Sequence, residues 1–436
     1  MDHAGRPAGR LCLSIPPPTR IRCSGRLACR AGDAPVRLAI ITPKVDRNDG
    51  QGRVNMEIAV EAIRQGHEVT LFAEQVQGLP TLGAEGLRTV LLTPPPWLPS
   101  RLLRDQLFAL RSYLALRREA NWLDALLANG FVTWAKCDIN AVHFVHASWL
   151  SSPSHPGGIR DGLKGLYASV YSRINVMLEA GAFRRSRYLV PVSESVAGDL
   201  RRVCQSQQGT ITITNGVDIT EFFPGPAERR RFGMLEGVPL ALFAGDLRSP
   251  RKNLDTVLRS LTRVPELHLA VAGRAEGTPY PELACRIGVA DRVHFLGFRR
   301  DMPDLMRSAD LFVFPSRYEA CSLVLLEALA SGLPVVTARS TGGSELVTPE
   351  VGVVIANSES IDELACALQS LVADAVRRQA MAHRARALAE RHSWKAMATR
   401  YLDLLTLVAA ERAHASHRRT NRMRRDGTPL SSVPRV

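Results

Sequence analysis

The sequence predicts an α/β protein built from two doubly wound parallel sheets that face a central cleft. From Arg37 onward, short apolar strands alternate with longer amphipathic segments. The alternation breaks after Asn215-Gly216, where prolines and glycines gather, and it starts again at Leu240. Alternation of this kind is typical of parallel sheets covered by helices. Two rounds of it in 436 residues fit two such domains.

The first half, residues 36–215, contains a series of candidate strands and a clear first helix. Each candidate strand is a short apolar run, as expected of a strand that is buried on both faces. The candidates are residues 38–41, 69–72, 90–92, 125–128, 141–145, 188–190 and 210–213. The first helix is expected over residues 55–65, because Gly66 follows it as a stop signal.

The second half, residues 216–392, repeats this pattern after a linker-like stretch that contains Pro224-Gly225-Pro226. Its candidate strands are residues 240–244, 268–272, 293–296, 311–314, 335–336 and 353–355. A final helix within residues 393–412 is expected to pack back on the first domain. Its apolar positions at helical spacing are Trp394, Met397, Tyr401, Leu404 and Leu405. Open α/β folds bind ligands beyond the carboxyl ends of their strands, so the site is expected in the cleft.

The formal net charge of +14 is carried partly by two tails. Residues 1–35 and 413–436 are basic and are predicted to be disordered. No run of eighteen apolar residues occurs, and the apolar stretch at residues 11–15 is too short for a signal peptide, so a cytoplasmic protein is expected. The eight cysteines form no C-x-x-C pair, which disfavours a zinc site or a disulfide framework. No nucleic-acid motif accompanies the charge, so an anionic membrane is the better candidate partner.

Two glutamates eight residues apart, Glu319 and Glu327, are the most informative feature of the chain. Residues 311–314 read as a buried strand, and residues 322–330 read as the helix that follows it. Glu319 is therefore expected on the loop beyond the strand, and Glu327 about two turns into the helix. The helix N-terminus between them offers backbone N–H groups to an anion. Two carboxylates that can accept sugar hydroxyls beside a phosphate cradle suit a nucleotide-sugar.

Two further loops lie between a candidate strand and a helix. One carries Gly50 and Gly52, and glycine lets a ligand approach the backbone closely at a helix N-terminus. The other carries Asp246, Arg248 and Lys252, and its cations are suited to neutralise a diphosphate. The simpler alternatives are an ordinary strand-to-helix loop and a solvated basic surface.

Polar residues in the first half are candidates for orienting a sugar or an acceptor. His143 and His146 are expected to alternate on one strand over residues 141–149, with His146 nearer the carboxyl end. Asn129 closes the preceding candidate strand and is expected beside His146. A structural role is the alternative for a histidine on a strand.

Together these segments resemble family 4 of the retaining glycosyltransferases, which have the GT-B fold of two Rossmann-like domains. The resemblance runs from about residue 37 to residue 401 and is densest in the second domain. It rests on Asn215-Gly216-Val217-Asp218 with Phe222 and Pro224, Phe243-Ala244-Gly245 with Arg251-Lys252, Ala272-Gly273, Phe295-Leu296-Gly297, Ser308-Ala309-Asp310 and the stretch from Glu319 to Glu327.

The resemblance implies a role for each residue that would bind the donor. Glu327 would accept the ribose hydroxyls, and Glu319 would contact the transferred sugar. Lys252 would bind the diphosphate, and the backbone near Phe298 would meet the base. Further donor contacts would come from Gly50, Gly52, Arg248 and the backbone N–H groups of Cys321, Ser322 and Leu323.

The resemblance also implies that His146 or Asn129 orients the sugar or the acceptor.

The sequence departs from the family pattern at three places. The family usually has arginine at the position of Asp246, so either Arg248 supplies the charge or Asp246 pairs with a neighbour. The usual histidine is missing at Asn129, and residues 320–322 replace a commoner Gly-Phe-Gly.

The resemblance therefore predicts a retaining hexosyltransferase that needs no metal ion and no cofactor beyond its nucleotide-sugar co-substrate. The donor would be a UDP- or GDP-sugar, and the acceptor a glycan or a lipid-linked glycan of the cell envelope. The predicted catalytic residues are Glu319, Lys252 and His146. The alternative is a non-catalytic sugar-nucleotide-binding protein on the same scaffold, which the retention of Glu319, Glu327 and Lys252 disfavours. No specific nucleic acid is expected as a partner.

Residues 97–122 form a basic amphipathic segment with a tryptophan at each end. Its arginines are Arg101, Arg104, Arg111, Arg117 and Arg118. Such a helix can lie on an anionic membrane surface, and the alternative is a helix packed on the first sheet with its basic face in solvent. We therefore expect peripheral contact with the cytoplasmic face of a membrane.

Overall fold

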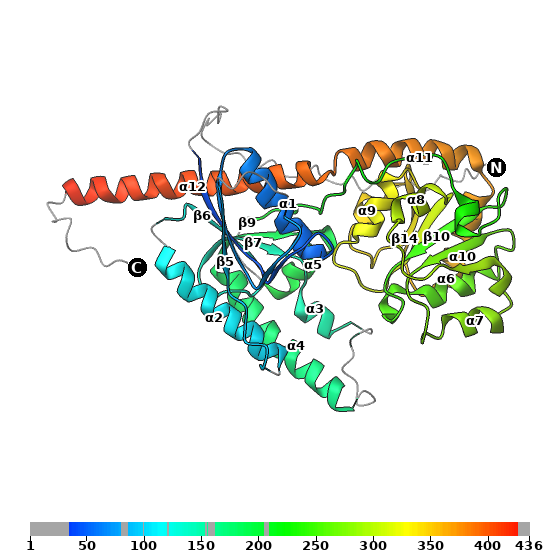
Figure 1. Cartoon of the computed structure of the whole chain (residues 1–436), viewed down its shortest axis with the longest axis horizontal. Coiled ribbons are helices and arrows are strands. Elements are labelled where there is room, and N and C mark those ends of the chain that lie inside the picture. Colours follow the sequence, from blue (N-terminus) through cyan, green and yellow to red (C-terminus); the bar gives the residue numbers. More distant parts are fainter. Residues whose placement is uncertain are drawn as a thin grey trace, which may run out of the picture. The chain divides into compact units, whose positions relative to one another are not determined.

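The computed structural model describes residues 35–79, 86–98, 100–119, 122–152, 155, 162–204 and 209–425 (Figure 1). The predicted N-terminal extension lies outside these residues up to position 34, and so does the end of the predicted tail from position 426. The described chain from Val36 onward is one compact unit. It contains two large parallel sheets, which confirms the predicted fold class.

The first sheet has seven strands in the order β5-β3-β1-β6-β7-β8-β9. All neighbouring strands run parallel. The strands are β1 (Arg37–Ile41), β3 (Glu68–Ala73), β5 (Leu87–Leu91), β6 (Ala125–Asn129), β7 (Cys137–Val142), β8 (Ser186–Pro191) and β9 (Gly209–Thr210). Two short strands, β2 (Lys44–Val45) and β4 (Gln75–Val76), pair separately.

The central strand β1 is buried on both faces because helices cover the sheet from either side. Leu38 and Ile40 belong to one apolar cluster, whereas Ala39 and Ile41 belong to another, as the alternation of side chains along a strand requires. The helices of this half are α1 (Gly50–Arg64), α2 (Arg101–Glu119), α3 (His146–Leu150), α4 (Gly162–Arg185) and α5 (Glu194–Val203).

Helix α1 begins five residues earlier than the sequence pattern predicts. The Asp49 side chain accepts a hydrogen bond from the Gly52 N–H at 2.7 Å and so caps the helix at Gly50. A β-carbon at Gly52 would lie only 2.9 Å from the backbone nitrogen of Asp46, so the capped turn has room for glycine alone. Both glycines of the predicted ligand loop therefore lie in the first turn of a helix.

The second sheet has six strands in the order β12-β11-β10-β13-β14-β15, again all parallel. The strands are β10 (Leu240–Ala244), β11 (His268–Ala272), β12 (Val293–Phe295), β13 (Leu311–Phe314), β14 (Val335–Ala338) and β15 (Gly352–Ile355). The helices that accompany them are α6 (Leu254–Leu261), α7 (Tyr280–Arg286), α8 (Met302–Arg307), α9 (Leu323–Ala330), α10 (Ile361–Val372) and α11 (Ala375–Glu390). One apolar cluster runs through this whole half.

The last helix, α12 (Trp394–Arg425), returns to the first half of the chain (Figure 1). Its apolar side chains, Tyr401 and Leu405 among them, are buried in the cluster that contains β1 and α1. The prediction of a disordered tail from residue 413 is wrong for residues 413–425, which continue this helix. An ion pair between Arg412 and Asp138 at 2.7 Å anchors it, and the alanines and arginines that follow are good helix formers.

Two strand predictions of the first half also need correction. The predicted strand over residues 141–149 ends at Val142, and His146 instead opens helix α3. The cause is a contact that is distant in sequence, because Glu179 of α4 accepts a hydrogen bond from the His146 N–H at 2.9 Å. Residues 210–213 form a strand only at Gly209–Thr210.

Candidate active site

A cleft of about 440 Å³ opens where the ends of both sheets meet, within the usual size range of small-molecule sites. Elements from both halves of the chain line it. The lining residues are Gly50, Gln51, His143, Phe144, Trp149, Val192, Asn215, Arg251, Glu319, Ala320, Cys321 and Leu323. Of the predicted site residues, the structure brings Gly50, Glu319, Cys321 and Leu323 to this cleft.

Glu319 lies at the charged centre of the cleft. Its carboxylate accepts a hydrogen bond from the Lys252 ammonium at 2.6 Å, and the Arg251 guanidinium lies 3.5 Å away. The side chains of Lys252 and Glu319 are only 13% and 16% exposed, so water screens this pair little. The structure therefore joins two predicted catalytic residues that are 67 positions apart.

The loop after β13 is tied to the turn that carries the two cations. The Arg317 N–H and the Ser316 hydroxyl both donate to the Arg251 carbonyl, at 2.8 and 2.9 Å. Asn253 has a left-handed backbone, with φ of 67°, and donates from its side chain to the Pro315 carbonyl at 2.9 Å. Asparagine tolerates this conformation better than most residues. These bonds fix Glu319 above Lys252.

Backbone hydrogen bonds of Gly342 hold the same loop in place. Its N–H donates to the Glu319 carbonyl at 2.8 Å, and its carbonyl accepts from the Ser322 N–H at 2.9 Å. A β-carbon on Gly342 would collide with the Ala320 carbonyl and would lie 2.6 Å from the Glu319 carbonyl oxygen. Only glycine fits there, although the sequence pattern gives no sign of this role.

The N-termini of α1 and α9 converge on the cleft. A β-carbon on Gly50 would lie 3.7 Å from the Leu323 side chain, which shows how closely the two helix starts approach. The backbone N–H groups in a first helical turn attract anions. Two of these N–H groups already have hydrogen-bond partners. The Gly52 N–H donates to the Asp49 side chain, and the Ser322 N–H donates to the Gly342 carbonyl. These two N–H groups are not free in this structure, and the donor-binding roles of Gly52 and Ser322 stay predictions.

Arg248 and Phe298 do not line the cleft. The Arg248 guanidinium pairs with Asp246 at 3.0 Å on the surface, and its hydrogen bonds lower the pKa of that carboxyl. Of the two alternatives for Asp246, pairing with a neighbour is the correct one. Arg251 takes the place predicted for Arg248 as the second cation. Phe298 is 65% exposed, with the Arg274 guanidinium 5.8 Å from its ring centre.

Glu327 lies in α9 as predicted, but it is not among the side chains that line the cleft. It is half-buried. Burial, with a smaller effect from the charge of Glu221, raises the pKa of its carboxyl to about 7, while Arg53 acts in the opposite direction. A carboxyl in this state holds a proton that an exposed glutamate would have released.

We expect Glu327→Gln to change how the stability of the protein depends on pH. Above about pH 4.5 the unfolded chain releases the proton of Glu327, whereas the folded chain keeps it up to about pH 7. The folded parent therefore loses stability as the pH rises through this window, by at most about 3 kcal/mol, because one pKa unit corresponds to about 1.4 kcal/mol. Urea unfolding at about pH 5 and about pH 8 measures this loss.

The glutamine variant should gain stability over the parent at the higher pH, because it carries no proton to lose. Glu266→Gln is the matched control, since Glu266 is exposed in the same half of the chain. Parallel pH profiles for the parent and Glu327→Gln would contradict the raised pKa.

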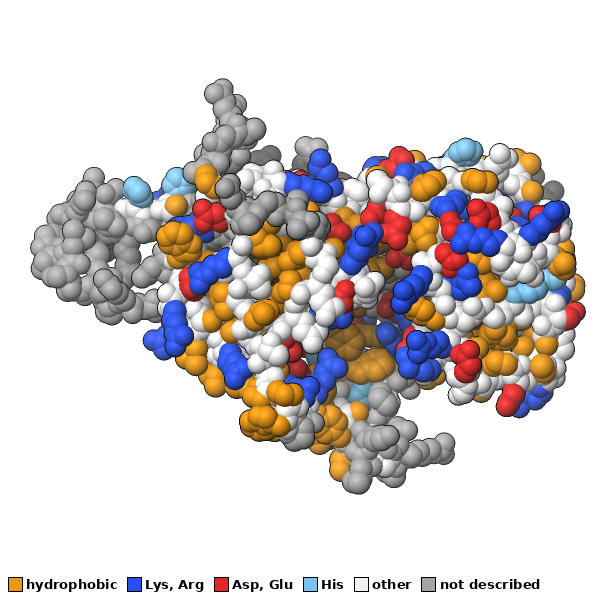
Figure 2. Space-filling model, in the orientation of Figure 1, with side chains coloured by type: hydrophobic (Ala, Val, Ile, Leu, Met, Phe, Trp, Pro, Cys, Tyr) orange, Lys and Arg blue, Asp and Glu red, His pale blue; other side chains and the backbone are white. Residues whose placement is uncertain are grey.

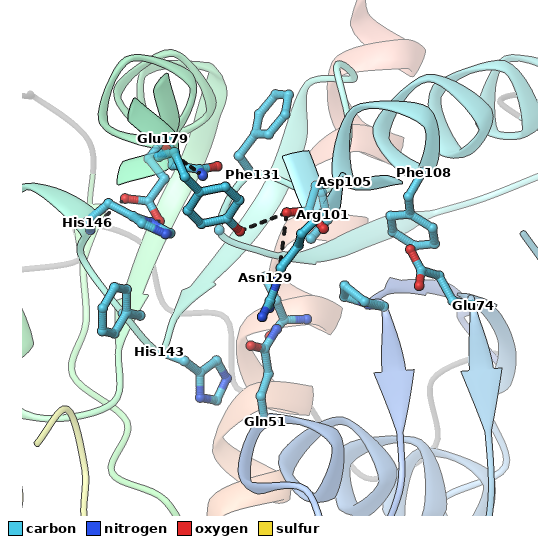
Figure 3. A pocket seen from close by; sticks show the side chains of 16 residues that line it. Gln51, Glu74, Arg101, Asp105, Phe108, Asn129, Phe131, His143, His146 and Glu179 are labelled. Atoms are coloured by element: carbon cyan, nitrogen blue, oxygen red, sulfur yellow. Dashed lines mark hydrogen bonds and ion pairs between the residues drawn. The ribbon is translucent and has the colours of Figure 1, made fainter. Parts of the chain in front are cut away.

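A second cavity adjoins the cleft within the first half of the chain (Figure 3). Gln51, His143 and Phe144 line both spaces. The second cavity holds the two residues predicted to orient a sugar or an acceptor, His146 and Asn129. His146 Nδ1 is hydrogen-bonded to Glu179 at 2.7 Å, and Figure 3 shows the two side chains together.

His143, rather than His146, is the histidine shared with the cleft of Glu319. The strand ends before both residues, so the expected alternation along one strand does not apply. Burial lowers the pKa of His143 to about 4, so its imidazole is neutral near pH 7. Its Nε2 atom is buried without a hydrogen-bond partner. The prediction that His146 is the better cleft candidate is therefore wrong, because His146 lines only the second cavity.

Cys321 also lines the cleft. Burial raises the pKa of the Cys321 thiol to about 12, so it remains a neutral thiol. Among the residues that the structure describes, no group of three or more His, Cys, Asp or Glu side chains could hold a metal ion.

Several residues of the cleft were not predicted from the sequence. Asn215 and Arg251 both belong to segments that carry the family resemblance, so the sequence could have indicated them. Trp149 and Val192 carried no signal, because only the packing of the two halves brings them to the cleft. Trp149 lies 5.4 Å, between ring centres, from Tyr318 of the opposite half.

Solved structures of glycosyltransferases share this arrangement of two parallel sheets. The protein is similar to sucrose-phosphate synthase from Thermosynechococcus elongatus, with a TM-score of 0.71 and 19% identity, over 86% of this chain and all of that one. It is also similar to WaaG, a glycosyltransferase of lipopolysaccharide biosynthesis, with a TM-score of 0.64 and 20% identity, over 85% of this chain and 99% of that one. At these identities the likeness concerns the fold, and the fold is GT-B.

Family models cover both halves of the chain. Residues 48–221 match the model described as Glycosyltransferase Family 4, and residues 238–374 match Glycosyl transferases group 1. The chain belongs to this family of glycosyltransferases.

Curated relatives agree with this assignment. A D-inositol 3-phosphate glycosyltransferase of Xylanimonas cellulosilytica is 29% identical over 82% of this chain and 91% of its own length. The lipopolysaccharide glucosyltransferase WaaG of Escherichia coli K12 is 32% identical, over 36% of this chain and 43% of its own length.

Proposed function

We propose that this glycosyltransferase transfers a hexose with retention from a UDP- or GDP-sugar to a glycan or lipid-linked acceptor of the cell envelope. The observation that carries the proposal is the pair of Glu319 and Lys252, in which Glu319 lines the cleft between the two sheets and Lys252 lies behind it. The relative named as a lipopolysaccharide glucosyltransferase supports an envelope acceptor. The site is proposed to act at the cytoplasmic face of a membrane.

The proposed reaction stabilises the leaving diphosphate with fixed charges. The bond from the anomeric carbon to the diphosphate oxygen breaks, and negative charge develops on that oxygen. We propose that Lys252, Arg251 and the N-terminus of α9 stabilise this charge, which their position around Glu319 supports. The acceptor hydroxyl attacks from the same face, and its proton passes to the departing phosphate oxygen, which retains the anomeric configuration. We propose that these cations make a divalent metal ion unnecessary.

The charged pair of Lys252 and Glu319 also argues against the alternative of a non-catalytic protein. A sugar-nucleotide-binding scaffold without chemistry would not need Lys252 and Glu319 buried together, because buried charges are costly to maintain without a role. The departure at Asp246 does not favour that alternative, since Arg248 neutralises it.

Screening nucleotide-sugars by thermal unfolding tests the donor. A ligand at about 100 times its dissociation constant should stabilise the protein by roughly 2.7 kcal/mol. UDP- and GDP-sugars are the expected hits, and proton NMR of the product then reports the anomeric configuration. A protein that no nucleotide-sugar stabilises would contradict the proposal.

The membrane part of the proposal rests on the outer faces of α2 and α4, which together we call the α2–α4 face. The two helices touch, because the Tyr171 hydroxyl donates to Asp105 at 2.7 Å. Figure 2 shows hydrophobic and basic side chains next to one another over α2. The exposed apolar residues of the face are Leu103, Leu110, Leu114, Leu166, Tyr167, Val170 and Met177. No described helix is long and apolar enough to cross a membrane.

We expect replacement of Leu103, Leu110 and Leu114 with glutamine to weaken binding to anionic vesicles at least about tenfold. Burial of apolar side chains in the lipid interface supplies much of the affinity of such a face. Arg104 and Arg111 are poorer targets, because they bond the carbonyls of Pro96, Leu98 and Thr93 and so hold a loop in place. Co-sedimentation with vesicles of anionic lipid measures the effect.

The matched control carries glutamine at Leu235, Val376 and Leu407, which are similarly exposed elsewhere on the protein. It should sediment with vesicles as the parent does. If the α2–α4 variant also sediments like the parent, the face is an ordinary solvated surface.

A further inference from the structure

The charged side chains that line the cavity beside the cleft are mostly carboxylates. Three carboxylates, those of Glu74, Asp105 and Glu179, face one guanidinium, that of Arg101. The Arg101 side chain is 79% exposed and lies 4.0 Å from Asp105, and its charge also acts on Glu74. One largely solvated cation of the lining therefore faces three carboxylates. Figure 3 shows Glu179 beside His146 on one side of the cavity and Glu74 beside Phe108 on the other.

Asn129 adds an acceptor whose orientation is fixed. Its side-chain amide donates to the Ile41 carbonyl at 3.1 Å and to Asn55 Oδ1 at 3.0 Å. Both amide hydrogens are therefore used, and a reversed amide would place its oxygen against the Ile41 carbonyl. The Oδ1 atom remains buried without a partner, in a residue that is only 5% exposed. A buried acceptor of this kind can take a hydrogen bond from a ligand hydroxyl or amine that enters the cavity.

The carboxylates differ in how far they are already satisfied. Glu179 accepts from both the backbone and the ring of His146, and Asp105 accepts from Tyr171. Glu74 is half-buried, and burial together with the nearby charge of Asp105 raises the pKa of its carboxyl, while the charges of Arg104 and Arg101 act in the opposite direction. A ligand that brings hydrogen-bond donors would give Asn129 Oδ1 a partner, and one that brings positive charge would offset the carboxylates around Glu74. An anion would instead add a further negative charge.

We infer that this cavity binds the acceptor through hydroxyl or amino groups and rejects an acceptor that places a phosphate or carboxylate there. The inference deepens the proposed function and rests on it, because the cavity shares Gln51, His143 and Phe144 with the proposed donor cleft. Glu74 and Asn129 Oδ1 are the groups that set this preference. The acceptor is thus a neutral sugar or an amino sugar at the end that enters the cavity.

Saturation-transfer NMR on the full chain tests this preference with three probes. The probes are methyl glucoside, glucosamine and glucose 6-phosphate, which are neutral, cationic and anionic. The first two should bind at least about tenfold more tightly than the phosphate, since a buried site rejects a group that leaves its polar atoms unpaired. Equal or tighter binding of glucose 6-phosphate would overturn the inference, and so would the absence of binding by both other probes.

Charge reversal at Glu74 gives an independent test. Glu74→Lys should reverse the order, so that glucose 6-phosphate binds about tenfold more tightly than glucosamine. Glu68→Lys is the control, because Glu68 is exposed at the start of β3, whereas Glu74 follows the end of that strand, and it should change nothing. If the lysine variant does not fold, Glu74→Gln should still weaken glucosamine binding severalfold. An unchanged order in a folded Glu74 variant would overturn the role of this residue.

Asn129→Ala separates this inference from the proposed function. It should weaken methyl glucoside binding while the stabilisation by a nucleotide-sugar stays as in the parent. A protein that binds the neutral probes but that no nucleotide-sugar stabilises would contradict the proposed function and leave the cavity preference standing. A protein that nucleotide-sugars stabilise but that prefers glucose 6-phosphate would contradict the inference alone.

Discussion

Lys252→Ala is expected to lower the turnover of sugar transfer by about a hundred- to a thousandfold, the usual cost of removing one preorganised electrostatic donor. Lys252 is held 2.6 Å from Glu319, which lines the cleft, and its ammonium lies 5.2 Å from the centre of the Phe314 ring. In this variant, the negative charge that develops on the leaving diphosphate would lack its nearest buried cation. Initial rates with saturating donor and acceptor measure the loss.

The fold should survive this change, because Arg251 remains 3.5 Å from Glu319 as a partner. Lys252→Met keeps the aliphatic part of the side chain and should lose as much activity as the alanine variant. Arg248→Ala is the matched control, since Arg248 lies on the same loop but pairs with Asp246 on the surface. Near-normal turnover in Lys252→Met, or an equal loss in Arg248→Ala, would show that another group stabilises the diphosphate.

Gly342→Ala is expected to reduce transfer by about a hundredfold, although residue 342 does not line the cleft. The added methyl group would collide with the carbonyl of Ala320, so the loop that carries Glu319 must move. Displacement of a reacting group by about 1 Å can cost roughly a hundredfold in rate. Overpacking of this kind also destabilises the protein by about 1–3 kcal/mol. Steady-state kinetics and urea unfolding measure the two effects.

Gly198→Ala is the control for this prediction. Gly198 lies in α5, and a β-carbon there would lie 3.7 Å from the Arg201 side chain, an ordinary contact. Alanine is a better helix former than glycine by about 1 kcal/mol, so this variant should be at least as stable as the parent. A folded Gly342→Ala protein with parental turnover would mean that the loop tolerates displacement.

The sequence alone determined the fold class, the two sheets and the location of the site. Apolar runs such as residues 311–314 are buried strands because their side chains must be covered on both faces, and this local rule needs no knowledge of distant contacts. The same rule predicted that the loop of Glu319 follows the strand at residues 311–314 and that the turn of Lys252 follows the strand at residues 240–244. Both residues therefore lie in the structure where the pattern predicted them.

Only the tertiary structure decided which side chains meet, because those contacts join residues that are far apart in the chain. His146 leaves the predicted strand for a helix because Glu179 caps it from 33 positions away. Arg251 replaces Arg248 beside Glu319 because the loop after β13 folds onto its carbonyl. Periodicity reports burial and the ends of elements, whereas the pairing of loops across two domains depends on packing that no local pattern encodes.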